Sequence, residues 1–205
     1  MEEYIKWSFE RDRSVLLVVD LQNAFVLDGV ILQVKEAKNQ LPKVKRLIKE
    51  CRELKLPIIY VRHETDPLYN PREIESFPML KEKGIKTGTF EAEIVYEIAP
   101  EANDTIVTKR RFSAFYQTDL EIILKNIRGQ KNPVDTVIIC GAMTNICCES
   151  TARDAFYRDF KVIFGSDVCA TTSVKAHNAT LANMEIFGRV MDHETIIRLL
   201  KNGVG

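Results

Sequence analysis

The chain has 205 residues, and its 29 basic and 29 acidic side chains give a formal net charge of zero at neutral pH. This length suits one domain with a single core, and the balanced charge leaves no basic excess to attract nucleic acid or anionic lipid. We therefore expect one domain over residues 1–205 that acts on a small molecule, with neither nucleic acid nor membrane as a partner.

The amino-terminal segment and the cysteines indicate the compartment. Residues 1–14 are charged and lack the apolar stretch of a signal peptide, and no apolar run in the chain is long enough to span a bilayer. Five cysteines without regular spacing are typical of reduced thiols. We expect a cytoplasmic protein in which Cys51, Cys140, Cys148 and Cys169 are structural.

Short apolar runs alternate with helical patterns along the chain. In order, we expect a strand at 15–19, a helix at 41–54, strands at 57–61 and 104–107, a helix at 119–127, a strand at 136–140, a helix at 147–159, a strand at 162–165 and a helix at 174–187. This alternation predicts an α/β fold, with a mostly parallel sheet between two layers of helices. Ligands of such sheets bind at the carboxyl ends of the strands.

Residues 62–93 interrupt the alternation. The segment has many charges, three prolines and two glycines. A long irregular segment inside a compact domain is usually functional or mobile. We expect a flap over the site or a packing element between subunits.

Cys147 is a candidate nucleophile. It follows the apolar run 137–140 and a short turn, and it lies in the first turn of the next expected helix. Unpaired backbone N–H groups and the helix dipole favour a thiolate at such a position. The alternative is a buried cysteine that fills space as a small apolar residue.

Three segments together resemble a known family. They are Leu17-Val18-Val19-Asp20-Leu21-Gln22-Asn23-Ala24-Phe25, Thr108-Lys109-Arg110-Arg111-Phe112-Ser113-Ala114-Phe115, and Gly141-Ala142-Met143-Thr144-Asn145-Ile146-Cys147-Cys148-Glu149-Ser150-Thr151-Ala152-Arg153-Asp154-Ala155. In this order they resemble the isochorismatase-like cysteine hydrolases, which include nicotinamidases and N-carbamoylsarcosine and ureidoacrylate amidohydrolases. The resemblance runs from about residue 15 to the carboxyl terminus. It implies a single-domain, three-layer α/β/α fold with a Rossmann-like sheet of six strands.

The resemblance also implies a catalytic triad. Cys147 would attack a carbonyl carbon, Asp20 would accept the thiol proton and return it to the leaving nitrogen, and Lys109 would stabilise both charged groups. A thioester intermediate would follow. Each residue has a simpler alternative, because Asp20 could cap a helix that begins near residue 22 and Lys109 could belong to a solvated basic run.

Two backbone features of the family fall on the turn before the nucleophile. The resemblance implies a cis peptide bond between Ala142 and Met143, and an oxyanion hole formed by the backbone amides of Met143 and Cys147.

The presence of Cys147 favours cleavage of a C–N bond, because true isochorismatases hydrolyse a vinyl ether without a cysteine nucleophile. Asn145 resembles the members that act on carbamoyl or ureido compounds, whereas nicotinamidases tend to have aspartate there. We therefore expect a metal-independent amidohydrolase of a small amide, carbamoyl or ureido compound. The alternatives are an isochorismatase, a nicotinamidase or a weakly active oligomeric scaffold.

A metal site is not expected. His63 lies near Glu64 and Asp66, but no further histidine follows until His177, and nicotinamidases of this superfamily bind a metal through several histidines in this region. This argues against a nicotinamidase and predicts no cofactor. We assign His177 and His193 to helix and surface positions.

Substrate contacts are expected from aromatic and polar side chains near the motifs. The candidates are Phe25, Phe112, Phe115, Tyr116, Asn145 and His63. Aromatic residues at such positions are as often part of the core.

Members of the family are commonly oligomeric, and closed symmetry is the usual arrangement. We expect a homodimer or homotetramer in which the helices after Cys147 and Ser173 make contacts.

Overall fold

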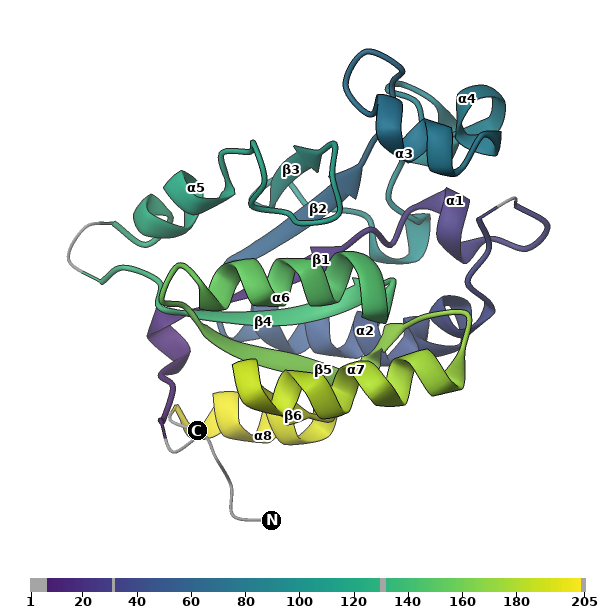
Figure 1. The fold of residues 1–205 in the computed structure, drawn as a ribbon. Helices are drawn as coiled ribbons and strands as arrows, with labels where there is room; N and C mark the ends of the chain where they lie inside the picture. Colours follow the sequence, from purple (N-terminus) through teal and green to yellow (C-terminus); the bar gives the residue numbers. More distant parts are fainter. Residues whose placement is uncertain (1–6, 31, 130–131, 204–205) are drawn as a thin grey trace.

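The computed structural model describes residues 7–30, 32–129 and 132–203. Within these residues a sheet of parallel strands lies between two layers of helices (Figure 1). The strands are β1 (Ser14–Val19), β2 (Ile58–His63), β3 (Thr105–Lys109), β4 (Thr136–Ala142), β5 (Lys161–Ala170) and β6 (Arg189–Met191). All neighbouring pairs are parallel, in the order β3-β2-β1-β4-β5-β6.

The helices cover both faces of the sheet. They are α1 (Asn23–Val26), α2 (Lys35–Glu53), α3 (Pro71–Ser76), α4 (Met79–Lys83), α5 (Leu120–Asn126), α6 (Glu149–Phe156), α7 (Val174–Phe187) and α8 (His193–Asn202). Apolar residues of α2 and α8 form one buried cluster with the sheet, and those of α5, α6 and α7 form a second cluster. Figure 1 shows α2 and α6 on opposite sides of β4.

The central strands are apolar because both of their faces are covered. In β1, Leu16 and Val18 belong to the cluster with α2, whereas Val15, Leu17 and Val19 belong to the cluster with α6. A strand buried on both faces has a continuous apolar run in place of an alternating pattern. The α/β, three-layer fold and the six-stranded parallel sheet predicted from the sequence are confirmed.

The strand order explains where a site can form. From β1 the chain continues toward one edge through β2 and β3, and from β4 it continues toward the other edge through β5 and β6. The connections after β1 and β4 therefore diverge and leave a crevice at the carboxyl ends of these two strands.

The segment 62–93 is more ordered than expected. Its first two residues complete β2, and it contains α3, α4 and a 3-10 turn at Phe90–Ala92. Figure 1 shows α3 and α4 beyond the carboxyl end of β2. The buried side chain of Gln22 ties the segment to the sheet, since its Nε2 donates to the backbone oxygens of His63 at 2.9 Å and Ala92 at 2.8 Å.

Some expected boundaries were wrong. The helix expected at 41–54 begins at Lys35, and Pro42 lies inside it. The helix expected at 147–159 starts earlier as a π-helical turn, Thr144–Cys148, which continues into α6. The sequence patterns missed β6, which has only three residues, and α8. None of the described helices is long and apolar enough to cross a bilayer.

Candidate active site

Three side chains from different strand ends meet beside the crevice. Asp20 follows β1, Lys109 is the last residue of β3, and Cys147 lies in the π-helical turn after β4. Lys109 Nζ is 2.8 Å from Asp20 Oδ2 and 3.3 Å from Cys147 Sγ. Asp20 and Lys109 are fully buried, and Cys147 is 7% exposed. A buried ammonium thus lies in contact with both a carboxylate and a thiol.

The Asp20 carboxylate is available to accept a proton. Its contact with Lys109 is an ion pair, but no donor among the described residues has the alignment of a conventional hydrogen bond to either carboxylate oxygen. The Asp20 backbone has a positive φ of 51° and its N–H donates to the oxygen of Val61 at 2.9 Å. Asp20 therefore does not cap α1, whose N-cap residue is Gln22.

The charges of the three groups depend on one another. Burial alone would lower the pKa of Lys109, but the negative charges of Asp20 and Cys147 outweigh it and raise the pKa above its ordinary value. Burial raises the pKa of the Cys147 thiol well above its ordinary value; Lys109 opposes this shift and Asp20 reinforces it. Burial therefore works against the thiolate that the helix start favours, and a base is needed to remove the proton of the thiol.

A mostly apolar cavity of about 160 Å³ opens beside the thiol. Its walls are formed by Phe25, Leu32, His63, Glu73, Phe77, Leu80, Ile85, Phe112, Met143, Ile146 and Cys147. Five of these residues, His63, Glu73, Phe77, Leu80 and Ile85, come from the segment 62–93. This segment therefore forms one wall of the cavity next to Cys147.

Comparison with known proteins assigns the family. Residues 14–195 match the isochorismatase domain. The chain belongs to the isochorismatase family. It is 35% identical to Nicotinamidase 3 of Arabidopsis thaliana over 194 residues, which cover 91% of this chain and 88% of that protein.

Two further relatives bear on the chemistry of this isochorismatase-family chain. Ureidoacrylate amidohydrolase RutB of Yersinia enterocolitica is 30% identical over 210 residues, covering 92% of this chain and 89% of that protein. The crystal structure of a cysteine hydrolase from Pseudomonas syringae pv. phaseolicola has a TM-score of 0.89 and 28% identity, and 97% of each chain is covered. The chain is thus an isochorismatase-like hydrolase, of a family that includes amidohydrolases.

The turn before the nucleophile has one of the two features that the resemblance implied. The peptide bond between Ala142 and Met143 is cis. Met143 lines the cavity together with Cys147. Phe25, Phe112 and His63, which we selected as substrate contacts from the sequence, also line this cavity.

Phe115 and Tyr116, which we also expected at the substrate, lie elsewhere. Phe115 is 5% exposed and packs in the core, with its ring centroid 5.9 Å from that of Phe160 and the guanidinium of Arg158 over its face. Tyr116 lines a different surface hollow together with Tyr69. The chain forms bends and turns over residues 110–119, and Phe112 lines the cavity beside Cys147 whereas Phe115 and Tyr116 do not.

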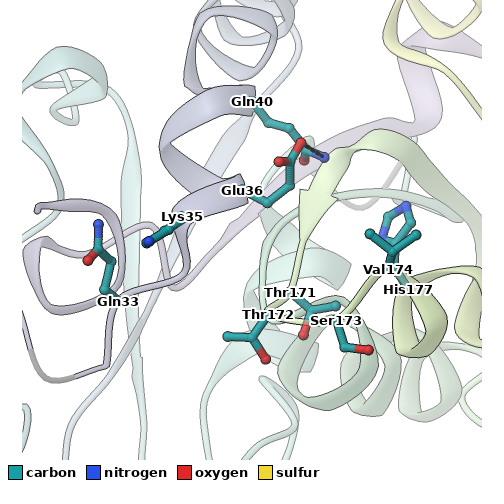
Figure 2. Close-up of a pocket in the computed structure, with 9 residues that line it drawn as sticks. All are labelled: Gln33, Lys35, Glu36, Gln40, Thr171, Thr172, Ser173, Val174 and His177. Carbon is teal, nitrogen blue, oxygen red and sulfur yellow. Dashed lines mark hydrogen bonds between the residues drawn. The ribbon is translucent and has the colours of Figure 1, made fainter.

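Asn145 is likewise absent from the described lining of the cavity. Its Oδ1 accepts a hydrogen bond from the hydroxyl of Thr171 at 2.6 Å. Thr171 lines another hollow, of about 530 Å³, between the amino-terminal ends of α2 and α7 (Figure 2). In the π-helical turn Asn145 and Cys147 are two residues apart, so their side chains point in different directions.

The other histidines have structural partners. His177 in α7 is hydrogen-bonded to the hydroxyl of Thr144 and to the backbone oxygen of Ser166, both at 3.0 Å. His193 is 8% exposed, with Nδ1 2.7 Å from Asp167 Oδ2, so its assignment to the surface was wrong.

Among the described residues, no three His, Cys, Asp or Glu side chains are grouped as metal ligands. Both ring nitrogens of His63 already have partners, Lys109 Nζ at 2.9 Å and Glu73 Oε1 at 2.8 Å. Glu73 has no signal in the sequence, because a glutamate in a charged segment gives no sign of burial; only the fold brings it to the cavity.

Proposed function

We propose that this protein is a metal-independent cysteine amidohydrolase that cleaves the C–N bond of a small amide, carbamoyl or ureido compound. One observation carries the proposal: the Lys109 ammonium lies between the Asp20 carboxylate and the Cys147 thiol at the wall of an apolar cavity. This set supplies a nucleophile, a group that moves protons and a charge that stabilises both.

The proposed reaction has two stages. Asp20 takes the proton of the Cys147 thiol while the sulfur attacks the carbonyl carbon, and Lys109 stabilises the negative charge that remains. The C–N bond then breaks, Asp20 delivers the proton to the departing nitrogen, and a thioester forms. Water attacks the thioester carbon while Asp20 again accepts a proton; the C–S bond then breaks, the acid leaves, and Asp20 returns the proton to the sulfur of Cys147.

The developing oxyanion needs donors on the cavity side of the carbonyl carbon. The backbone amides of Met143 and Cys147 are our candidates, because both residues line the cavity and both belong to the start of the helical segment that continues into α6. Backbone N–H groups at a helix start are not all used by the helix and carry partial positive charge.

The cavity favours an uncharged substrate. Its described lining contains no arginine or lysine but does contain the carboxylate of Glu73. Lys109 is fully buried and its ammonium is already surrounded by Asp20, Cys147 and His63. The carboxylate of an anionic substrate would lose its hydration in the cavity without gaining a cationic partner. This lining fits an uncharged amide better than the anionic ureidoacrylate named in one of the relatives.

Ammonia release from a panel of substrates tests the proposal. The panel contains nicotinamide, a small aliphatic amide, ureidoacrylate and a carbamoyl amino acid, each assayed with and without exhaustive chelation and with Cys147→Ala as the blank. We expect the protein to hydrolyse uncharged amides at a rate that chelation does not change. The Cys147→Ala variant should not hydrolyse them. Restoration of lost activity by added zinc, iron or manganese would refute metal independence, and a preference for the anionic compounds would refute the charge assignment.

A further inference from the structure

A chain of hydrogen bonds joins α3 to the lysine of the triad. Lys109 Nζ lies 2.9 Å from Nδ1 of His63, and Nε2 of His63 lies 2.8 Å from Oε1 of Glu73. Asn70 Nδ2 donates to Oε2 of Glu73 at 3.2 Å and to the backbone oxygen of Arg110 at 2.6 Å. The Glu73 carboxylate is thus anchored to the residue that follows the catalytic lysine.

The partners define which atoms carry protons. The raised pKa of Lys109 keeps its amine as an ammonium, which can only donate. Nδ1 of His63 must then accept, and its ring proton lies on Nε2, which donates to Glu73. Burial raises the pKa of Glu73, but the hydrogen bonds from His63 and Asn70 and the nearby positive charge of Lys109 outweigh it and lower the pKa below its ordinary value. Glu73 is therefore an acceptor, so each hydrogen bond from Lys109 through His63 to Glu73 has one donor and one acceptor.

The ammonium of Lys109 has more acceptors than protons. Its three N–H groups face Asp20 Oδ2, Cys147 Sγ, His63 Nδ1 and the backbone oxygen of Arg111, the last at 3.1 Å. The side chain is fully buried, so water does not compete for it. A change in any one acceptor redistributes the other contacts and moves Nζ relative to the sulfur.

We propose that Glu73 is a positioning residue. By holding the proton of His63 on Nε2, it keeps Nδ1 as the acceptor that fixes the Lys109 ammonium between Asp20 and Cys147. The wall of the cavity formed by α3 is thereby coupled to the triad. This inference rests on the proposed cysteine chemistry.

The test compares variants of one short helix. Glu73→Ala removes the acceptor, Glu73→Gln keeps an acceptor oxygen without the charge, and Glu75→Ala is the matched control, because Glu75 lies on α3 with its side chain 66% exposed and paired with Arg72. We expect kcat to fall about 10- to 100-fold for Glu73→Ala, with KM nearly unchanged, because a shift of about 1 Å in a catalytic group can have this effect. Glu73→Gln keeps an acceptor oxygen for His63, so its kcat should fall clearly less than that of Glu73→Ala, and Glu75→Ala should match the wild type.

A double-mutant cycle separates positioning from contact with the substrate. His63→Asn retains an acceptor near the place of Nδ1 but is too short to reach Glu73, so Glu73→Ala should have no additional effect in that background. Additive losses, a rise in KM alone, or equal losses for Glu73→Ala and Glu73→Gln would overturn the proposal. Thermal unfolding of each variant excludes a loss of folded protein as the cause.

A readout without substrate keeps the inference independent of the proposed function. The pH profile of Cys147 alkylation by iodoacetamide gives the pKa of the thiol, whereas access to the thiol changes only the plateau of the rate. A displaced Lys109 lowers the thiol pKa less, so the midpoint should move upward in Glu73→Ala and remain in place in Glu75→Ala. An unchanged midpoint in Glu73→Ala would overturn the positioning role, whatever the substrate panel shows.

Discussion

Val19 and Gly141 face each other at the carboxyl ends of β1 and β4, so closely that a Cβ on Gly141 would lie 1.9 Å from the carbonyl oxygen of Val19. Gly141 also has a φ of +133°. This close approach brings the residue after β1, Asp20, near the turn that follows β4 and carries Cys147. The first glycine of the motif around the nucleophile is therefore required by strand packing.

Gly141→Ala should be among the most destabilising single substitutions in this protein. The added methyl group would collide with backbone atoms of Val19, which cannot move away as a flexible side chain can. We therefore expect a loss of about 4–5 kcal/mol or more in the free energy of unfolding. Gly129→Ala is the matched control, since Gly129 also has a positive φ but nothing lies within 4 Å of an added Cβ. It should cost about 1–2 kcal/mol. Urea unfolding measures both, and equal costs would contradict the role of the close approach.

Cys147→Ala should abolish hydrolysis and leave the fold intact. Loss of a nucleophile typically lowers kcat by about 10⁴-fold or more. Cys148→Ala is the comparison: Cys148 is fully buried in the core, so its loss should cost about 1 kcal/mol of stability and leave kcat near that of the wild type. Mass spectrometry of a quenched reaction should find the acyl group on Cys147, and an acyl group on Cys148 would shift the assignment by one residue.

Asp20→Asn should separate reactivity of the thiol from turnover. The carboxylate raises the pKa of the Cys147 thiol, so removal of its charge should lower that pKa and speed alkylation at about pH 8. Turnover should fall roughly 10²- to 10⁴-fold, because the group that moves the proton is lost. Alkylation rates and kcat are measured on the same preparation. If both quantities fell together, Asp20 would have a structural role only.

The stability contributed by Glu73 should disappear in acid. The folded-state pKa of Glu73 lies below the 4.5 of an unperturbed glutamate. A carboxylate with a lowered pKa stabilises the fold fully above the unfolded-state value and loses this contribution as the pH falls through the folded-state value. Glu73→Gln should therefore cost about 1–3 kcal/mol at about pH 7 and progressively less below about pH 4.5. Urea unfolding at several pH values checks this, and a cost independent of pH would exclude the charged form as its source.

We propose that the chain assembles as a homodimer or homotetramer through α6 and α7. Tyr157, directly after α6, and Ile186 on α7 are 66% and 68% exposed, as an interface would require in the isolated chain. Ile186→Glu should reduce the mass measured by light scattering. Ile122→Glu on α5, where Ile122 is 64% exposed, should leave it unchanged. A wild-type mass equal to that of one chain over a wide concentration range would refute assembly.

The sequence was sufficient for the fold class and for the selection of three residues that the structure brings into contact. Apolar runs such as Val15–Val19 are long enough to show strands buried on both faces, and this pattern depends only on neighbouring residues. Asp20, Lys109 and Cys147 could be selected because each is at or beyond the carboxyl end of a strand, and parallel strands end at the same edge of a sheet. The family motifs then indicated a role for each residue.

The tertiary structure decided the composition and the charge of the site. Sequence spacing could not show that Phe115 turns into the core while Phe112 turns toward the cavity, because direction depends on how the chain bends after β3. Nor could it show that Glu73 is buried against His63, since a glutamate among other charged residues gives no local signal of burial. Contacts between residues far apart in the chain, and the pKa shifts that follow from burial, arise only when the layers pack together.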